Sequence, residues 1–165
     1  MRIIKPYVIV READSLKMLK NIEKAGRVCY KSEGNITDDS YKKFIGKLIK
    51  LEHFSQLEHE KMTVQIICDR GVSHELVRHR IASFSQESTR YCNYSADRFG
   101  NEITVIEPFF FKSDYTYSSN YDKWVEVCSI CEQAYFDLLK NGATPQEART
   151  ILPNSLKTEV VITAN

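Results

Sequence analysis

The sequence predicts an α+β protein with a mainly antiparallel sheet of about four strands covered by long helices. Several short segments are rich in residues that favour β-structure. Other, longer segments place apolar residues at helical spacing. The apolar fraction of 42% and the charged fraction of 27% are ordinary for a folded globular chain.

The length of 165 residues predicts one domain, residues 1–165, that is large enough to bury a sizeable core. The net charge is +1 at pH 7, so any basic function must be local, and we expect no nucleic-acid polymer and no membrane as partner. No window approaches the length of a membrane span, and the N-terminus lacks a signal-peptide pattern. Five scattered cysteines fit reduced thiols, and we expect a cytoplasmic protein.

Four β-rich segments are expected to supply the strands. The first runs from Ile3 to Val10 and is interrupted by Pro6, which suggests an edge position or a bulge. The second, Met62–Cys68, partly alternates between apolar and polar residues. The others are Glu102–Ile106 and Val160–Thr163, the latter rich in β-branched residues.

Two helices are expected in the first third of the chain. Apolar residues between Leu16 and Ile22 recur at helical spacing, and Gly26 is expected to end or weaken that helix. Thr37 is expected to cap the second helix, with Asp38 and Asp39 in its first turn. The predicted core stripe of the second helix consists of Tyr41, Phe44, Ile45, Leu48 and Ile49.

A long helix is expected to open at Ser118 or Ser119 and to end at Gly142. Its predicted apolar stripe consists of Trp124, Cys128, Cys131, Tyr135 and Leu138. The Cys128-x-x-Cys131 pair lies in the middle of this helix on its predicted buried face. Reactive pairs lie at helix N-termini, where the thiolate is stabilised, so core packing is the preferred interpretation.

Two features flank this helix. The aromatic run Pro108–Phe111 is either an exposed patch or core, and core is the preferred interpretation. Residues Thr144–Glu147 form a capping box with Pro145 at the first helical position. Arg149 then lies one turn from the start of a short helix that Pro153 stops.

The most distinctive stretch is Arg78–Arg90, which contains three arginines, one histidine and four hydroxyl side chains. Arginine offers a fixed fork of donors that matches phosphate oxygens, so this stretch predicts a phosphate-bearing ligand. A short helix capped by Asp69 or Ser73, with Gly71 in the turn between them, is expected to run to about Arg80. It would place Glu75 beside Arg78 and His79, and the serine-rich residues would form the following loop.

The residues of this stretch resemble a known signature. Arg78-His79-Arg80, followed by Ser83, Glu87, Ser88 and Arg90-Tyr91, resembles the Arg-His-Arg…Ser signature of the flavin-dependent thymidylate synthases. Upstream, His53–His59 resembles the family's His-x-Ser/Thr-x-x-Glu-His segment, and downstream Glu147–Pro153 resembles a third block. The three blocks occur in the family's order and cover most of the chain.

The resemblance implies methylation of dUMP to dTMP, with methylenetetrahydrofolate as the carbon donor and NADPH as the reductant of bound FAD. It also implies a homotetramer with active sites shared between subunits. The implied FAD-binding residues are His53, Ser55, Arg78, His79 and Arg80. The implied dUMP-binding residues are Glu75, Arg78, Gln86, Glu87, Ser88, Thr89, Arg90 and Arg149. Ser88 is expected to bind rather than attack, because His79 lies between two cations and is a poor base.

The sequence departs from the family in two places. Ser85-Gln86 stands where the family commonly has Asn-Glu, and a glutamine cannot act as a carboxylate. Family members also continue beyond the counterpart of Asn165 into a helix whose Arg activates the uracil. No catalytic residue is therefore assigned in this chain, and we expect these residues alone not to turn over substrate.

Three alternatives remain beside the enzyme. The first is a non-catalytic module that binds FAD or a nucleotide. The second is an RNA-binding domain, which is disfavoured because no aromatic stacking platform is interleaved with the arginines. The third is a metal site at His53, Glu58 and His59, with His79 as a further candidate ligand. The spacing matches no zinc pattern, and we expect no metal.

Overall fold

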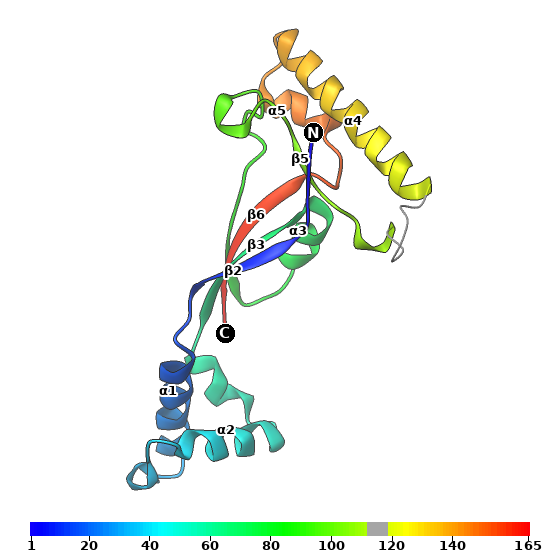
Figure 1. The fold of residues 1–165 in the computed structure, drawn as a ribbon. Helices are drawn as coiled ribbons and strands as arrows, with labels where there is room; N and C mark the ends of the chain where they lie inside the picture. The colour runs from blue at the N-terminus through cyan, green and yellow to red at the C-terminus, as the bar shows by residue number, and fades with distance from the viewer. Residues whose placement is uncertain (112–118) are drawn as a thin grey trace. The chain divides into compact units, whose positions relative to one another are not determined.

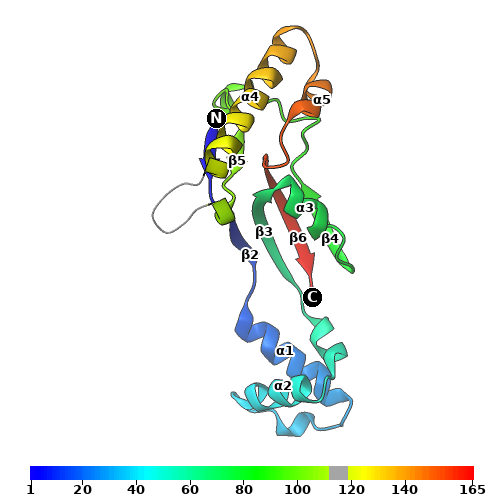
Figure 2. The same cartoon turned by 90° about the vertical axis from the view of Figure 1, so that its right-hand side faces the viewer.

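The computed structural model describes residues 1–111 and 119–165, and it confirms the α+β class. One antiparallel sheet has the strand order β2-β3-β6-β4 (Figure 1 and Figure 2). A second sheet pairs β1 with β5 in parallel. The strands are β1 (Arg2–Ile4), β2 (Tyr7–Glu12), β3 (Met62–Asp69), β4 (Ala82–Gln86), β5 (Thr104–Ile106) and β6 (Lys157–Ala164). The α-helices are α1 (Ser15–Val28), α2 (Ser40–Lys50), α3 (Arg70–Leu76), α4 (Ser119–Lys140) and α5 (Pro145–Ala148). The short 3₁₀ helices are η1 (Glu33–Asn35), η2 (Phe54–His59), η3 (Asp97–Phe99), η4 (Phe109–Phe111) and η5 (Arg149–Ile151).

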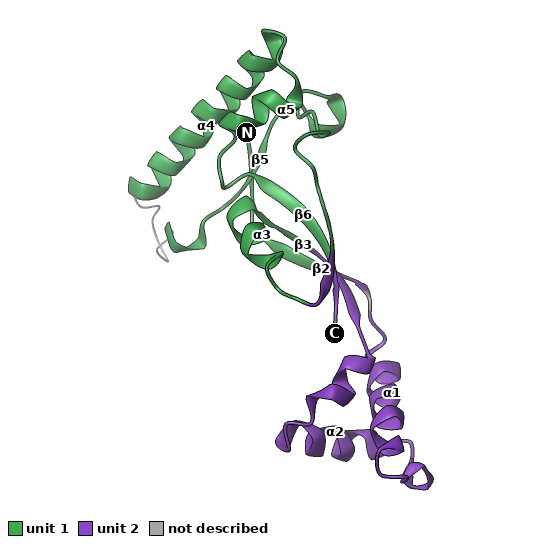
Figure 3. Ribbon diagram, turned by 180° about the vertical axis from the view of Figure 1, so that it is seen from behind, with its two compact units in different colours: residues 1–8, 66–80, 84–161 green, residues 9–65, 81–83, 162–165 purple. Residues whose placement is uncertain are grey.

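The chain divides into two compact units (Figure 3). Unit 1 consists of residues 1–8, 66–80 and 84–161, and unit 2 consists of residues 9–65, 81–83 and 162–165. Strands β2, β3, β4 and β6 each contribute residues to both units. The expectation of a single domain therefore stays a prediction.

Unit 2 is built around α1 and α2, which pack against each other (Figure 2). Its core consists of Ile22, Tyr41, Ile45 and Leu48, flanked by Leu19, Phe44 and Leu57. Gly26 does not end α1, so that part of the expectation was wrong, while a weakening of the helix stays a prediction. The glycine is buried inside the helix, and a Cβ placed there would lie 2.6 Å from Cε1 of Phe44. The missing side chain allows the aromatic ring to approach the helix backbone.

The start of α2 also differs from the expectation. Asp39 rather than Thr37 is the N-cap, and the helix begins at Ser40. The Ser40 hydroxyl accepts a hydrogen bond from the Thr37 amide at 2.9 Å, so the residues before the helix form a separate turn. Ile49 was expected in the core but is 53% exposed. Of the predicted stripe, Tyr41, Ile45 and Leu48 are buried.

Unit 1 has its core between α4, β5 and the segment that leads into β6. The buried residues are Tyr94, Ile103, Val105, Cys128, Tyr135, Ala148 and Leu156. Ser118 lies outside the described residues, so α4 is described from Ser119 onward. Burial raises the pKa of the Cys128 thiol to about 11, which fits packing rather than redox chemistry. Leu138 was expected in the stripe but is exposed.

The N-terminal segment forms two strands instead of one. Residues Lys5 and Pro6 separate β1 from β2, and the two strands join different sheets. β2 lies at an edge of the larger sheet, a position that tolerates a neighbouring proline because no ladder hydrogen bond is lost. Phe109 and Phe110 are 80% and 67% exposed, so the expectation that they lie in the core was wrong.

Candidate functional site

The site is built on the junction between β3 and α3. Asp69 is both the last residue of β3 and the N-cap of α3. Its carboxylate accepts a hydrogen bond from the Val72 amide at 2.8 Å. No turn intervenes, so Gly71 lies inside the helix instead of before it, and Ser73 is not the cap. A Cβ at Gly71 would lie 2.8 Å from Nδ2 of Asn154. The glycine therefore lets α3 approach the segment that precedes β6.

Helix α3 is shorter than expected and ends at Leu76, before the Arg78-His79-Arg80 triplet. The triplet lies in the turn that leads to β4, and the Arg78 amide donates to the Glu75 carbonyl at 3.0 Å. All three side chains are exposed. Within residues 1–111 and 119–165 they make no side-chain hydrogen bond or ion pair, and the expected side-chain pairing with Glu75 is not found there either.

The residues after the triplet form a strand, β4, although a loop was expected. Burial alternates along β4: Ser83 and Ser85 are exposed, while Ala82, Phe84 and Gln86 are half-buried. This alternation is the normal signature of a strand with one covered face. The serines led to the prediction of a loop, because serine is a common loop residue.

Gln86 is held inside unit 1, between α3 and β6. Its amide nitrogen donates to Oγ of Ser73 at 2.9 Å and to Oγ1 of Thr158 at 3.1 Å. The guanidinium of Arg70 donates to the same threonine oxygen at 3.1 Å and to the Glu87 carbonyl at 3.2 Å. A carboxylate at position 86 could not donate these hydrogen bonds. The structure thus gives a physical reason for glutamine at this position.

Beyond β4, the chain turns tightly at Ser88. Its carbonyl accepts the amides of Tyr91 and Cys92, and its hydroxyl accepts the Arg90 amide at 3.3 Å. Thr89 is buried, whereas the exposed Arg90 donates from Nε to Gln146 at 3.1 Å. Ser88 hydrogen-bonds to no imidazole and no carboxylate in the described part of the chain. It therefore lacks the adjacent base that a serine nucleophile needs.

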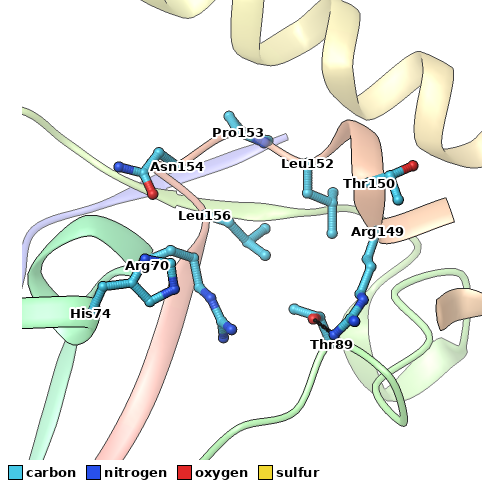
Figure 4. Close-up of a pocket in the computed structure, with 9 residues that line it drawn as sticks. All are labelled: Arg70, His74, Thr89, Arg149, Thr150, Leu152, Pro153, Asn154 and Leu156. Carbon is cyan, nitrogen blue, oxygen red and sulfur yellow. Dashed lines mark hydrogen bonds between the residues drawn. The ribbon is translucent and has the colours of Figure 1, made fainter. Parts of the chain in front are cut away.

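A pocket of about 350 Å³ opens beside this turn. The residues that line it are Arg70, His74, Thr89, Arg149, Thr150, Leu152, Pro153, Asn154 and Leu156. Figure 4 shows the guanidinium groups of Arg70 and Arg149 reaching toward the same space from opposite sides, below Leu152 and Leu156. Three basic side chains and no carboxylate line the pocket, so its charge suits a small anion.

Arg149 reaches this pocket because of the predicted capping box, which the structure confirms. The Thr144 hydroxyl accepts the Glu147 amide, and the Glu147 carboxylate accepts the Thr144 amide at 2.8 Å. These hydrogen bonds from Thr144 hold the pKa of Glu147 below its ordinary value. Arg149 follows one turn later, and its Nη1 lies 3.4 Å from Oγ1 of Thr89.

The structure brings together only part of the expected substrate-binding set. Thr89 and Arg149 line the pocket, whereas Glu75, Arg78, Gln86, Glu87, Ser88 and Arg90 do not. Arg70 and His74 do line it, and sequence reasoning missed both. A signal was present, because they lie four residues apart on a helix that starts directly after a strand.

The other expected FAD-binding residues, His53 and Ser55, belong to unit 2. They were expected in a loop, but the segment from Phe54 to His59 is the 3₁₀ helix η2. Nδ1 of His53 lies 3.3 Å from the Tyr30 hydroxyl, and the Ser55 hydroxyl donates to Gln56 at 3.2 Å. Both side chains are exposed. Arg78, His79 and Arg80 belong to unit 1, so the expected FAD-binding residues are divided between the two units.

Two further observations concern the described residues as a whole. Across residues 1–111 and 119–165, no three histidine, cysteine, aspartate or glutamate side chains are grouped so that they could hold a metal ion. None of the helices described is both long enough and apolar enough to span a membrane.

Comparison with solved structures identifies the class of fold. The chain superimposes over its whole length on 75% of the UMP/dUMP methylase PolB from Streptomyces cacaoi bound with 5-Br dUMP, with a TM-score of 0.78 and 22% identity. The same methylase bound with 5-Br UMP gives a TM-score of 0.76, also at 22% identity. By its architecture, the chain thus has the fold of a UMP/dUMP methylase.

Sequence comparison gives the family. Residues 13–165 match the model of the thymidylate synthase complementing proteins, and the chain belongs to this family. It is 33% identical over 148 residues to the flavin-dependent thymidylate synthase of Geobacter sulfurreducens, covering 86% of this chain and 61% of that protein. It is 34% identical over 131 residues to that of Pyrococcus furiosus, covering 79% of this chain and 52% of that protein. The chain therefore spans between about half and three fifths of these relatives' length.

Proposed function

We infer that this chain carries the nucleotide- and flavin-binding part of a flavin-dependent thymidylate synthase. The proposed reaction methylates dUMP to dTMP, with methylenetetrahydrofolate as the carbon donor and NADPH as the reductant of FAD. The observation that carries the proposal is the pocket of Arg70, His74 and Arg149, which offers three basic side chains and no carboxylate to an anion. Its volume of about 350 Å³ lies at the lower end of the range for ligand sites, roughly 300–1,000 Å³, and favours a mononucleotide over a dinucleotide.

In this proposal, Arg149 and Arg70 bind the phosphate of dUMP, and Thr89 adds a hydroxyl group beside it. Ser88 stays a predicted nucleotide contact from the family resemblance. Ser88 acts as a binding group because no base contacts it in the described residues. Glu75, Arg78 and Arg90 stay predicted nucleotide contacts from the family resemblance. Gln86 acts indirectly in this proposal, since its amide is bound to Ser73 and Thr158.

The residues proposed for FAD fit an anionic cofactor. Arg78, His79 and Arg80 are exposed and free of intramolecular side-chain partners among the described residues, so their donors are available to a pyrophosphate. His53 and Ser55 stay predicted FAD contacts from the family resemblance. When bound, the flavin supplies hydride transfer, and the protein's part is to bind and orient the reactants.

The decisive experiment for the nucleotide site is a calorimetric titration of the chain with dUMP and with deoxyuridine, which lacks the phosphate. We expect binding of dUMP and much weaker binding of deoxyuridine. Arg149→Gln should weaken dUMP binding by about 10- to 100-fold, since a hydrogen bond to a charged group contributes about 1.5–3 kcal/mol. Arg98→Gln is the matched control, because Arg98 is an exposed arginine of unit 1 that lies over the Phe99 ring, outside this pocket. Equal affinities for dUMP and deoxyuridine would contradict the proposal.

Flavin binding and turnover are tested separately. The purified chain should be yellow with FAD, and Arg80→Ala should release the flavin while the circular dichroism spectrum stays unchanged. Tritium release from labelled dUMP, with methylenetetrahydrofolate and NADPH present, measures methylation. Tritium release by these residues would exclude the alternative of a non-catalytic binding module. We extend the proposal to a homotetramer in the cytoplasm. Light scattering after size-exclusion chromatography measures the molecular mass and so tests the tetramer.

A further inference from the structure

Glu87 lies within the turn proposed to hold dUMP, but its carboxylate is engaged inside unit 1. Oε1 accepts a hydrogen bond from the Tyr94 hydroxyl at 3.1 Å, and Oε2 accepts one from Nζ of Lys157 at 2.9 Å. The side chains of Glu87 and Lys157 are only 12% and 17% exposed. The carboxylate is thus occupied by two partners within the chain, away from the Arg70–Arg149 pocket.

The backbone of Glu87 is held as well. Its amide donates to the Glu159 carbonyl at 2.9 Å, and its own carbonyl accepts from the Arg70 guanidinium at 3.2 Å. All four polar groups of Glu87 therefore have partners. The next residues, Ser88 to Arg90, follow directly from this anchored position. Within them, the Thr89 hydroxyl contacts Arg149.

Lys157 is the charged centre of this arrangement. Besides Glu87, its ammonium group contacts the Glu159 carboxylate at 2.7 Å. Burial alone would lower the pKa of Lys157, but the hydrogen bonds to Glu159 and Glu87 outweigh that effect and raise the pKa. The ammonium group therefore stays charged at neutral pH.

We propose that Lys157 is a positioning residue for nucleotide binding: its ion pair with Glu87 holds Ser88–Arg90 in place without touching the substrate. This inference rests on the function proposed above. A role in stability alone is the competing explanation. Buried ion pairs contribute little net stability, because removing the charges from water offsets most of their attraction, so stability is a weak reason for this pair.

The test compares Lys157→Met with Lys123→Met in the full chain. Lys123 forms an ion pair with Glu126 at 2.9 Å, but both side chains are exposed, so it provides a matched lysine outside the site. Calorimetry should show dUMP affinity reduced about tenfold or more in Lys157→Met, the scale expected when a hydrogen bond to a charged group is lost. Lys123→Met should bind as the wild type does. Lys157→Arg keeps the cation and should recover most of the affinity.

Amide hydrogen exchange of the ligand-free protein gives a second, independent reading. The amides of Tyr91 and Cys92 donate to the Ser88 carbonyl, so they report on the order of this turn. Lys157→Met should speed their exchange by about tenfold or more without affecting the middle of α4, as expected for local rather than global opening. Glu87→Gln should have the same effects, and it replaces Lys157→Met if that variant does not fold.

The outcomes separate the inference from the proposed function. Unchanged dUMP affinity and unchanged exchange at Tyr91 and Cys92, even with reduced stability, would overturn the positioning role. Failure of the wild type to bind dUMP would count against the proposed function instead. In that case the exchange rates alone decide whether Lys157 orders the turn.

Discussion

Two glycines of unit 2 provide a test of how closely α1 and α2 pack. Gly26 lies inside α1, where an added Cβ would meet the Phe44 ring at 2.6 Å. Gly46 lies inside α2, and an added Cβ would have no neighbour within 4 Å. We predict that Gly26→Ala destabilises the protein and that Gly46→Ala stabilises it.

The magnitudes follow from two opposing contributions. Alanine is more favourable than glycine inside a helix by about 0.5–1 kcal/mol, and Gly46→Ala should gain this amount. Gly26→Ala gains the same amount, but it also forces Phe44 to move, and overpacking a core costs about 1–3 kcal/mol. The net expected loss is about 1 kcal/mol.

The assay is urea unfolding of the full chain followed by far-ultraviolet circular dichroism. The midpoint should rise for Gly46→Ala and fall for Gly26→Ala, with similar slopes. Replacing Phe44 by leucine should recover part of the loss in the double variant, because the two positions are in contact. A Gly26→Ala protein as stable as Gly46→Ala would refute the reasoning about this contact.

Two further predictions concern unit 1. Burial, aided by the neighbouring Glu87, raises the pKa of the Tyr94 hydroxyl. Above about pH 10 the unfolded chain therefore loses the hydroxyl proton, whereas the folded protein keeps it. The free energy of unfolding should fall as the pH rises past about 10. Tyr94→Phe should reduce this fall in alkaline unfolding experiments, whereas Tyr91→Phe, at a residue 75% exposed, should leave it unchanged; equal curves for the two variants would contradict the assignment. Thr144→Ala removes the N-cap that precedes Arg149 and should cost about 1 kcal/mol and weaken dUMP binding. Thr37→Ala, at a threonine that caps no helix, should change stability by less than about 0.5 kcal/mol, and a similar loss in both would argue against the cap.

Much of the local structure could be predicted because its causes lie within a few residues. The β-rich pattern of Met62–Cys68 predicted β3, and Thr144–Glu147 predicted the capping box, since its hydrogen bonds join residues three apart. The long α4 followed from a regular apolar spacing, although its buried stripe is narrower than expected. The three motif blocks together, Arg78–Tyr91, His53–His59 and Glu147–Pro153, indicated the family that the comparisons show.

The errors arose where distant residues decide the outcome. Gly26 is accommodated inside a helix where the ring of Phe44, eighteen positions away in the sequence, occupies the space beside it. The serine-rich segment after Ile81 forms a strand because β6 lies beside it, a partner more than seventy residues later. Local propensity cannot reveal such partners, because long-range pairing and packing override it.

The candidate site divides in the same way. The sequence by itself determined which groups could bind a phosphate, since guanidinium and hydroxyl chemistry does not depend on the fold, and it included Thr89 and Arg149. Only the tertiary structure decided that Arg70 joins Arg149 in one pocket and that Glu87 turns inward to Lys157. The physical reason is that convergence depends on β3, α3, α5 and β6 coming together in space. Residues 70 and 149 line one pocket, and residues 87 and 157 form an ion pair, only through that packing, and no local pattern in the sequence encodes it.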